Sequence, residues 1–289
     1  MDAPQDIATL RLSDVRRRFD RAAARFDAVD FVHRVTRDGL LARLEPMAID
    51  ARTIVDLGCA TGSACRPLAR RFRRAHIIAI DLSRPMLLQV LRKRTWFAKN
   101  SLVQANAVAL PLTDQSVDIV FANLLLPWID DHSRLFGEVT RVLRKDGLML
   151  FATLGPDSLL EIRRAWQSVD DRPHVNVFPD MHDIGDAAVR AGLQDPVLDV
   201  DRLAVTYTSS DDLFCDLTAT GSRNSLQHRS RSLIGRNRFR TMTAALDAAK
   251  TDGLVNLELE IVYGHCWGSG PIARGAEYRV DAAHIGRRK

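Results

Sequence analysis

The chain has 289 residues, 46% of them hydrophobic, which suits one large globular domain or two small ones. The formal net charge is +5 at pH 7, carried mainly by arginine, and basicity alone identifies no partner. No run of about 18 apolar residues is present, and the N-terminus lacks the pattern of a secretory signal. We therefore expect a cytoplasmic protein without a membrane-spanning helix.

The cysteines and histidines do not predict a metal site. The four cysteines are Cys59, Cys65, Cys215 and Cys266, and none of them forms a C-x-x-C pair. No histidine cluster has the spacing of metal ligands. We expect reduced, partly buried thiols and no bound metal.

The first half of the chain predicts a parallel sheet. Residues 12–26 form an amphipathic helix with an arginine-rich outer face, and a second helix is predicted at about 30–45. Strands are then predicted at 53–58, 76–81, 101–106, 117–127 and 148–154. Helices alternate with them at 64–72, 82–94 (with Ser83 as N-cap) and 131–144, and a turn is predicted at 145–147. This alternation implies right-handed crossovers and a sheet covered on both faces.

The second half completes this sheet less regularly. Helices are predicted at 157–166 and at 181–193, the latter ended by Gly192. Strands at 202–207 and 257–268 flank a helical section at about 211–250. The predicted fold is therefore α/β, a doubly wound, mostly parallel seven-stranded sheet with an N-terminal helix and a helical cap insertion.

Three strand ends carry residues suited to an adenosine ligand. In "DLGCATG", Gly58 and Gly62 allow a close approach of the backbone, but the spacing departs from the G-x-G-x-x-G dinucleotide fingerprint and from a phosphate-binding loop. Asp81 ends the second strand and can accept from both hydroxyls of a ribose. Asn106, after the third strand, can pair with an adenine edge. The pattern predicts an adenosine site without a pyrophosphate site.

This combination resembles the class I S-adenosylmethionine-dependent methyltransferases, with "DLGCATG", "IDLSRPML" and "QANAVALPL" matching their cofactor motifs. The sequence departs from the commonest family form at Ala60, where glycine is usual, and at Asn106, where aspartate is usual. The resemblance implies S-adenosyl-L-methionine as cofactor. It implies these cofactor-binding residues: Asp56, Gly58, Cys59, Ala60, Gly62, Asp81, Leu82, Met86, Asn106, Ala107, Asn123 and Leu124.

Longer segments resemble one family more specifically. "VRRRFDRAAARFD", "LLLPWIDD", "RVLRKDGLMLFATLGPDSLLEIRRAW", "FPDMHDIGDAAVRAGLQDPVLD" and "YGHCWG" are similar to the malonyl-acyl-carrier-protein O-methyltransferases of biotin biosynthesis. The similarity extends over nearly the whole chain and departs at Phe26, where many relatives carry tyrosine. It implies an N-terminal helical segment at 1–46 that covers the active site and a methyltransferase domain at 47–289.

The resemblance implies that the methyl acceptor is the free carboxylate of a malonyl thioester on an acyl-carrier protein. Such a carboxylate, with a pKa of about 4, is ionised at pH 7 and needs no general base. An arginine should hold it, because the guanidinium fork pairs with carboxylates in a bidentate geometry. The candidates are Arg163, Arg164 and Arg223, while Phe26 and Trp128 are candidates for apolar walls.

The acidic carrier protein gives the basic N-terminal helix a hypothetical role. Arg16, Arg17, Arg18 and Arg21 would steer the carrier protein toward the site. Nucleic acid is not expected as the substrate. The fourth strand ends in "NLLLPW", which differs from the N-P-P-Y-like tetrapeptide of DNA amino-methyltransferases.

Three alternatives stay open from the sequence. A mitochondrial assembly factor for respiratory complex I, associated with arginine hydroxylation, is similar over the same core and would require an oxygen-activating metal. The chain could also be a non-catalytic adenosine-binding protein, or a methyltransferase acting on another small molecule. The sequence does not predict the oligomeric state.

Overall fold

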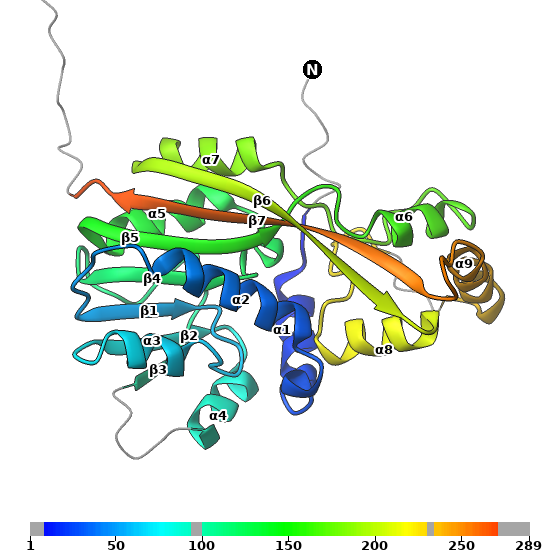
Figure 1. Cartoon of the computed structure of the whole chain (residues 1–289), viewed down its shortest axis with the longest axis horizontal. Helices are drawn as coiled ribbons and strands as arrows, with labels where there is room; N and C mark the ends of the chain where they lie inside the picture. Colours follow the sequence, from blue (N-terminus) through cyan, green and yellow to red (C-terminus); the bar gives the residue numbers. More distant parts are fainter. Residues whose placement is uncertain (1–8, 94–99, 230–233, 271–289) are drawn as a thin grey trace, which may run out of the picture.

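The computed structural model describes residues 9–93, 100–229 and 234–270. Seven strands form one sheet in the order β3-β2-β1-β4-β5-β7-β6 (Figure 1). β7 runs antiparallel to both of its neighbours, and the remaining pairs are parallel. The predicted doubly wound, mostly parallel seven-stranded sheet is confirmed. The strands are β1 (Thr53–Leu57), β2 (His76–Asp81), β3 (Asn100–Gln104), β4 (Val117–Asn123), β5 (Leu143–Leu154), β6 (Leu193–Tyr207) and β7 (Val255–Gly268).

Helices precede and connect these strands. They are α1 (Leu12–Ala22), α2 (Phe31–Leu44), α3 (Cys65–Arg71), α4 (Arg84–Lys93), α5 (His132–Val142), α6 (Leu160–Gln167), α7 (Met181–Arg190), α8 (Ser210–Ala219) and α9 (Arg236–Ala248). Two short 3₁₀ turns, η1 (Phe26–Ala28) and η2 (Leu126–Trp128), lie beside the strand ends that carry the cofactor motifs.

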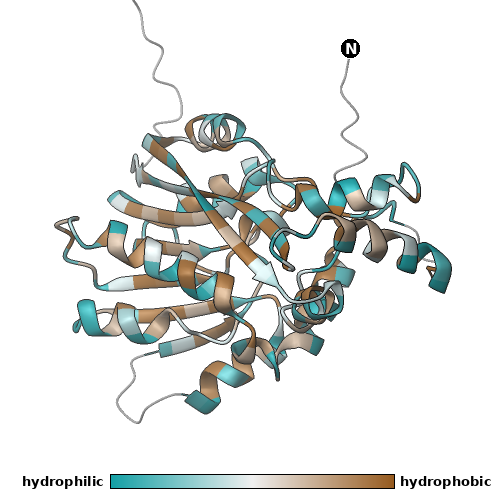
Figure 2. Cartoon of the chain, turned by 45° about the vertical axis from the view of Figure 1, so that its right-hand side comes forward, coloured by the Kyte–Doolittle hydropathy of each residue, from teal (hydrophilic) through white to brown (hydrophobic). Residues whose placement is uncertain are grey.

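Alternating side chains of the strands form a core on each face of the sheet. Ile54 of β1 packs in a cluster with residues of α2 and α3, whereas the next residue, Val55, packs in a second cluster with residues of α5 and α7. This is the period of two that places successive strand residues on opposite faces. In Figure 2 the strands are predominantly hydrophobic, and the covering helices are hydrophilic on their outer sides.

β6 and β7 extend beyond the rest of the sheet. Pairing between β5 and β7 ends at Leu154 and Ile261, but β6 and β7 stay paired as far as Tyr207 and Val255. The helices α8 and α9, which connect β6 to β7, lie beside this extension with α6 (Figure 1). The predicted helical insertion thus stands next to the ends of the parallel strands, although residues 230–233 within it lie outside the described part of the chain.

The end of β4 and the start of β6 were predicted wrongly. β4 ends at Asn123 instead of residue 127, because Leu124 takes a positive φ of 54° and donates its N–H to the carbonyl of Ala152. β6 begins at Leu193 instead of residue 202. Its early part contains Pro196, which an edge strand tolerates at a bulge, and the pairing with β7 is irregular at this point.

Other elements differ from the prediction at their ends. The turn expected at 145–147 is an irregularity inside β5, where Asp146 has a φ of 59°. The first helix stops at Ala22 instead of residue 26, and Phe26 lies in η1. β3 covers 100–104 instead of 101–106, and α6 and α7 are shorter than predicted. The last predicted residue of the 82–94 helix lies outside the described residues.

Two predicted helix boundaries agree with the structure. The Ser83 hydroxyl accepts the N–H of Met86 at 3.3 Å, as expected of an N-cap. Gly192 has a φ of 96° just after α7, a conformation that glycine adopts without strain. The division of the chain at residue 46 stays a prediction; Leu40 and Leu44 of α2 belong to the same core cluster as the sheet.

Candidate active site

The carboxyl ends of β1, β2, β3 and β4 surround one cavity, referred to below as the strand-end cavity. The loop after β1 forms one wall with unusual backbone angles: φ is 71° at Gly58 and 46° at Ala60. The Gly58 and Cys59 N–H groups donate to the carbonyl of Ile80, and the Ala60 N–H donates to the Asp81 carboxylate at 2.9 Å. Ala60 therefore fits the loop in place of glycine, with its backbone held by β2.

Two buried carboxylates stand at the ends of neighbouring strands in this cavity. Burial raises the pKa of Asp56 to about 7, and a hydrogen bond from the Cys65 thiol partly offsets this. Burial also raises the pKa of Asp81 to about 6, against the opposing effect of the N–H groups of Ser83 and Ala60. Both charged forms lack a cationic partner among the described residues. A ligand that carries positive charge and hydroxyl donors would satisfy them.

Two asparagines complete the polar lining. Asn106 lies after β3, in a turn in which its side-chain oxygen accepts the N–H of Val108 at 3.3 Å. The Asn123 amide donates to the His33 carbonyl at 2.8 Å, whereas its Oδ1 atom is buried without a partner among the described residues. Asn123 therefore lines the cavity with a polar side chain whose oxygen is enclosed and unpaired in the described part of the chain. The chemistry of this cavity thus fits S-adenosylmethionine.

The structure gathers most of the sequence-predicted cofactor residues around the strand-end cavity. Gly62 and Met86 lie beside it instead: Gly62 packs against Val90, and Met86 is buried in a cluster with Phe26. The predicted residues that line the cavity are Asp56, Gly58, Cys59, Ala60, Asp81, Leu82, Asn106, Ala107, Asn123 and Leu124.

The N-terminal segment contacts the loops that form this cavity. The Asp27 carboxylate accepts from the Thr61 hydroxyl and pairs with Lys93. Asp20 accepts from the Ser83 hydroxyl at 2.6 Å. Phe26 is 2% exposed and lines the cavity. Hydrogen bonds therefore tie α1 and η1 to the ends of β1 and β2.

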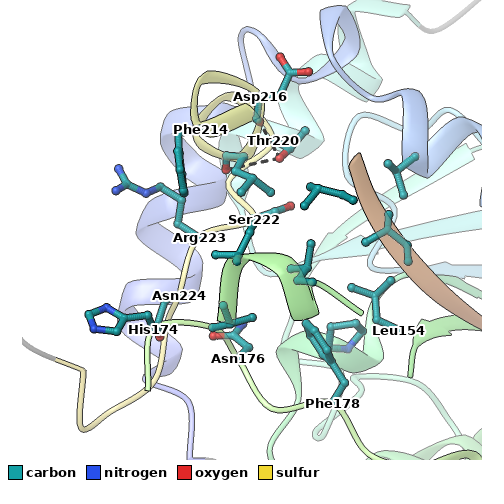
Figure 3. A pocket seen from close by; sticks show the side chains of 18 of the residues that line it. Leu154, His174, Asn176, Phe178, Phe214, Asp216, Thr220, Ser222, Arg223 and Asn224 are labelled. Atoms are coloured by element: carbon teal, nitrogen blue, oxygen red, sulfur yellow. Dashed lines mark hydrogen bonds between the residues drawn. The ribbon is translucent and has the colours of Figure 1, made fainter. Parts of the chain in front are cut away.

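A second cavity of about 240 Å³, referred to below as the cap cavity, lies under the helical insertion. Its walls come from α2, α6, α8, the segment 173–178 and the β6–β7 extension, and they are mostly apolar. Figure 3 shows the residues of α8 and its C-terminal loop, including Phe214, Asp216 and Arg223, on the side opposite Leu154 and Phe178. The loop is fixed by the Asn224 amide, which donates to the Pro173 carbonyl at 2.9 Å.

The three arginines predicted to bind a carboxylate lie in different places. Arg223 lines the cap cavity. The Arg163 guanidinium, in contrast, donates to the carbonyls of Pro156 and Asn176. Arg164 is exposed on α6, and neither Arg163 nor Arg164 is part of the cavity wall.

Arg18 belongs to the wall of the cap cavity, which the sequence did not indicate. Its guanidinium is half-buried and donates to the Asn224 carbonyl at 2.6 Å. Burial, together with the nearby Arg229 and Arg223, lowers the pKa of Arg18 to about 10. Arg229 is itself paired with Asp14 at 2.7 Å. The described wall thus contains three arginines and one acid, Asp216, so its net charge is positive.

The two cavities meet at three residues that line both of them: His33, Leu124 and Trp128. Trp128 packs edge-on against Phe19 of α1, with ring centroids 5.1 Å apart. The sequence singled out Trp128 and Leu124 but not His33. A lone histidine on the first turn of a helix carries no sequence signal for a site, because its position beside β4 depends on tertiary packing.

Two other kinds of site are absent from the described residues. In these ranges, no helix is both long and apolar enough to cross a bilayer. Nor do the described residues contain a group of three histidine, cysteine or acidic side chains placed to hold a metal ion.

Comparisons with known proteins identify the family. Residues 55–151 match the model of a methyltransferase domain. Malonyl-[acyl-carrier protein] O-methyltransferases of Halorhodospira halophila and Laribacter hongkongensis are each 40% identical to the chain, covering 99% and 94% of both partners. Among solved structures, the YcgJ protein of Bacillus subtilis has a TM-score of 0.56 at 13% identity, covering 80% of this chain and 98% of that one.

A phosphoethanolamine N-methyltransferase of Haemonchus contortus, solved with S-adenosyl-L-methionine, has a TM-score of 0.51 at 16% identity. The match covers 80% of this chain and 52% of that one. At these identities the structures establish the fold, whereas the two sequence relatives match over nearly their full length. The chain belongs to the malonyl-[acyl-carrier protein] O-methyltransferase family of S-adenosylmethionine-dependent enzymes.

Proposed function

We propose that the chain methylates the free carboxylate of a malonyl thioester carried by an acyl-carrier protein, giving the malonyl methyl ester that starts pimeloyl synthesis for biotin. The observation that carries this proposal is the meeting of two unlike cavities at His33, Leu124 and Trp128. The strand-end cavity contains buried acids and suits a cationic methyl donor. The cap cavity is apolar with arginines on one side and suits an anionic acyl group. The names of the full-length relatives support the same activity.

The strand-end cavity would hold the cofactor. Asp81 would accept from the ribose hydroxyls, Asn106 would pair with the adenine edge, and the loop from Gly58 to Gly62 would run beside the methionine portion. When bound, S-adenosylmethionine supplies a sulfonium methyl group, to which a carboxylate oxygen forms a bond while the S–C bond breaks, with no proton transferred. The chain's own residues bind, orient and exclude water.

The acceptor needs positioning rather than activation. A malonyl carboxylate is already ionised at neutral pH, so the rate depends on alignment and on a dry environment. Trp128 would provide an apolar wall where the cavities meet, and Phe26, which is 2% exposed, would provide one within the strand-end cavity. Phe26 has no hydroxyl, so any substrate contact made there is through the ring alone.

We further propose that Arg18 and Arg223 hold the substrate anion. Both line the cap cavity, and the Arg18 guanidinium lies half-buried near two other arginines. An anion between them would relieve this repulsion, and guanidinium groups bind carboxylates at short range with defined geometry. Arg163 is less suited, because it does not line the cap cavity and two of its N–H groups donate to backbone carbonyls.

A methyl-transfer assay tests the proposed function. The purified chain is incubated with labelled S-adenosylmethionine and either malonyl- or acetyl-acyl-carrier protein. Base-labile label on the malonyl form alone is expected. Binding of the cofactor without transfer would remove the assigned acceptor and leave the alternatives of a non-catalytic binder or another reaction. Absence of cofactor binding would overturn the interpretation of the strand-end cavity.

The variant Arg18→Gln tests the arginine assignment. Loss of a charge-assisted hydrogen bond should lower kcat/KM for malonyl-acyl-carrier protein about 10- to 100-fold, mostly through KM. The dissociation constant of S-adenosylmethionine, measured by calorimetry, should stay the same. The control is Arg190→Gln on the outer side of α7, where the side chain is 66% exposed. Equal kinetics of the two variants would contradict the assignment.

A further inference from the structure

The His33 imidazole lies at the junction of the two cavities. It belongs to the first turn of α2 and lines both the strand-end cavity and the cap cavity. The ring is deep inside the protein and packs edge-on against Phe26, with centroids 4.8 Å apart. The residue nevertheless keeps some accessible surface. We attribute this surface to the cavities that it lines.

The ring nitrogens of His33 have no hydrogen-bond partner among the described residues. Nδ1 is buried without a hydrogen-bond partner in the described part of the chain. The hydrogen bonds from Thr36 and Asn123 go to the backbone carbonyl of His33, not to its ring. Because an unpaired buried polar group costs about 1–3 kcal/mol, phenylalanine would be the more stable choice for packing alone. Nδ1 has no accessible surface and cannot itself meet a ligand, whereas Nε2 has no hydrogen-bond partner among the described residues and is the ring atom available to one.

We propose that His33 donates a hydrogen bond from its neutral ring to the malonyl carboxylate and turns that carboxylate toward the strand-end cavity. This inference rests on the proposed function. It makes His33 a substrate-binding residue at the point of methyl transfer, acting together with the charge supplied by Arg18.

A neutral donor suits this position for two reasons. Burial lowers the pKa of His33 to about 4 in the ligand-free protein, so the ring is neutral at pH 7 before substrate binds. A sulfonium nearby also favours the neutral ring and opposes the effect of the substrate carboxylate. A neutral N–H also binds a carboxylate less tightly than a second guanidinium would, which leaves the attacking oxygen more reactive. No proton moves during methyl transfer, so the ring keeps the same protonation state throughout.

The test compares His33→Phe with His33→Asn in the full-length enzyme. Phenylalanine keeps a flat ring against Phe26 but has no donor, whereas asparagine retains an N–H group. We expect His33→Phe to lower kcat for malonyl-acyl-carrier protein about 10- to 100-fold. His33→Asn should recover part of this loss. Cofactor affinity should change less than about threefold, the spread by which single interactions commonly vary with context.

A second readout separates substrate binding from a structural role. A histidine that supports the fold would lower the melting temperature when replaced, but an unpaired histidine should be replaced by phenylalanine with no loss of thermal stability. His265→Phe is the matched control: it lies on β7, partly buried beside Trp267, and lines neither cavity. Its kinetics should equal those of the wild type.

The outcomes are distinguishable. If wild-type enzyme does not methylate malonyl-acyl-carrier protein, the proposed function fails and this inference fails with it. If the wild type is active and His33→Phe keeps its kcat, the proposed function stands and the inference is overturned. Loss of cofactor binding or of thermal stability in His33→Phe would likewise overturn it, by assigning the ring to the cofactor or to the fold.

Discussion

Two acids of the strand-end cavity are suited to bind a cationic cofactor, but their ionised forms destabilise the ligand-free protein. Asp56 and Asp81 are charged groups in a buried environment, and burial raises the pKa of Asp56 to about 7 and of Asp81 to about 6. In the absence of ligand, ionising either carboxylate at neutral pH is unfavourable compared with the unfolded chain. A cationic ligand favours the ionised form, so cofactor binding and proton release should be coupled.

Cofactor affinity should therefore depend on pH. As the pH falls from 8 through about 6, Asp81 becomes protonated and its ability to accept ribose hydroxyls is reduced, so the affinity for S-adenosylmethionine should fall. Asp81→Asn should bind about 10-fold or more weakly at pH 8 and lose much of this pH dependence. Titration calorimetry at pH 5, 6, 7 and 8 gives both quantities. An unchanged affinity across that range would contradict the expectation.

At Asp56, by contrast, lowering the pH should stabilise the ligand-free protein. The folded-state pKa of about 7 exceeds the unfolded value, so this group favours folding below the unfolded pKa, and its contribution is lost as the pH rises through about 7. Asp56→Asn removes the ionisation. Its melting temperature should exceed that of the wild type by more at pH 8 than at pH 5. Equal melting-temperature differences at pH 5 and pH 8 would show that ionisation of the Asp56 carboxylate does not destabilise the folded protein.

At the scale of elements, the site depends on contacts between the N-terminal segment and the glycine loop. The ion pair between Asp27 and Lys93 is nearly half exposed on both sides and should add less than about 1 kcal/mol to stability. The hydrogen bond from Thr61 is different, because Thr61 is 1% exposed and lies inside the loop. Asp27 should therefore matter more for loop order than for global stability.

Asp27→Ala tests this role. Removing both contacts should change the melting temperature little, but raise hydrogen exchange of residues 58–64 and weaken cofactor binding about 3- to 10-fold, the effect of a typical net hydrogen bond. Exchange mass spectrometry and calorimetry measure the two effects. Asp186→Ala on α7, whose side chain is 72% exposed, is the control. A lower melting temperature with unchanged hydrogen exchange in residues 58–64 would contradict this role of Asp27.

The strands also show which elements a sequence pattern can locate and which it misses. The central parallel strands β1, β4 and β5 were located because each contains an apolar run that is buried on both faces of the sheet. The beginning of β6 was missed because an edge strand has no such run: most of its first residues are exposed, and Pro196 interrupts them. Its strand conformation comes from pairing with β7. The two paired residues nearest in sequence, Tyr207 and Val255, are 48 positions apart (255 − 207).

For the whole molecule, charge should influence how the carrier protein arrives. Arg17 and Arg21 are exposed on α1, whereas Arg18 on the same helix is less exposed and lines the cap cavity. Of the arginines predicted to steer the carrier protein, Arg18 therefore belongs to the cavity wall, whereas Arg17 and Arg21 stay on the surface. Arg17 also pairs with Asp14, which leaves part of its charge compensated.

Reversing this charge gives a whole-molecule test. The double variant Arg17→Glu/Arg21→Glu should lower kcat/KM for malonyl-acyl-carrier protein several-fold at low salt, with the difference shrinking as the ionic strength approaches about 0.15 M and the Debye length falls to about 8 Å. Cofactor affinity should remain unchanged. Stopped-flow or steady-state kinetics at several salt concentrations would detect the change in kcat/KM. Arg190→Glu, on the far helix α7, serves as control, and equal effects of both changes would contradict steering.

The sequence by itself determined the doubly wound sheet, the glycine loop and the acids at its strand ends. These features depend on short-range patterns: the period of apolar residues, backbone freedom at Gly58 and the position of Asp81 directly after a strand. Only the tertiary structure decided that His33, Leu124 and Trp128 join two cavities, and that Arg18 turns inward while its neighbours face solvent. Those relations come from packing between segments far apart in the chain. No local pattern encodes them.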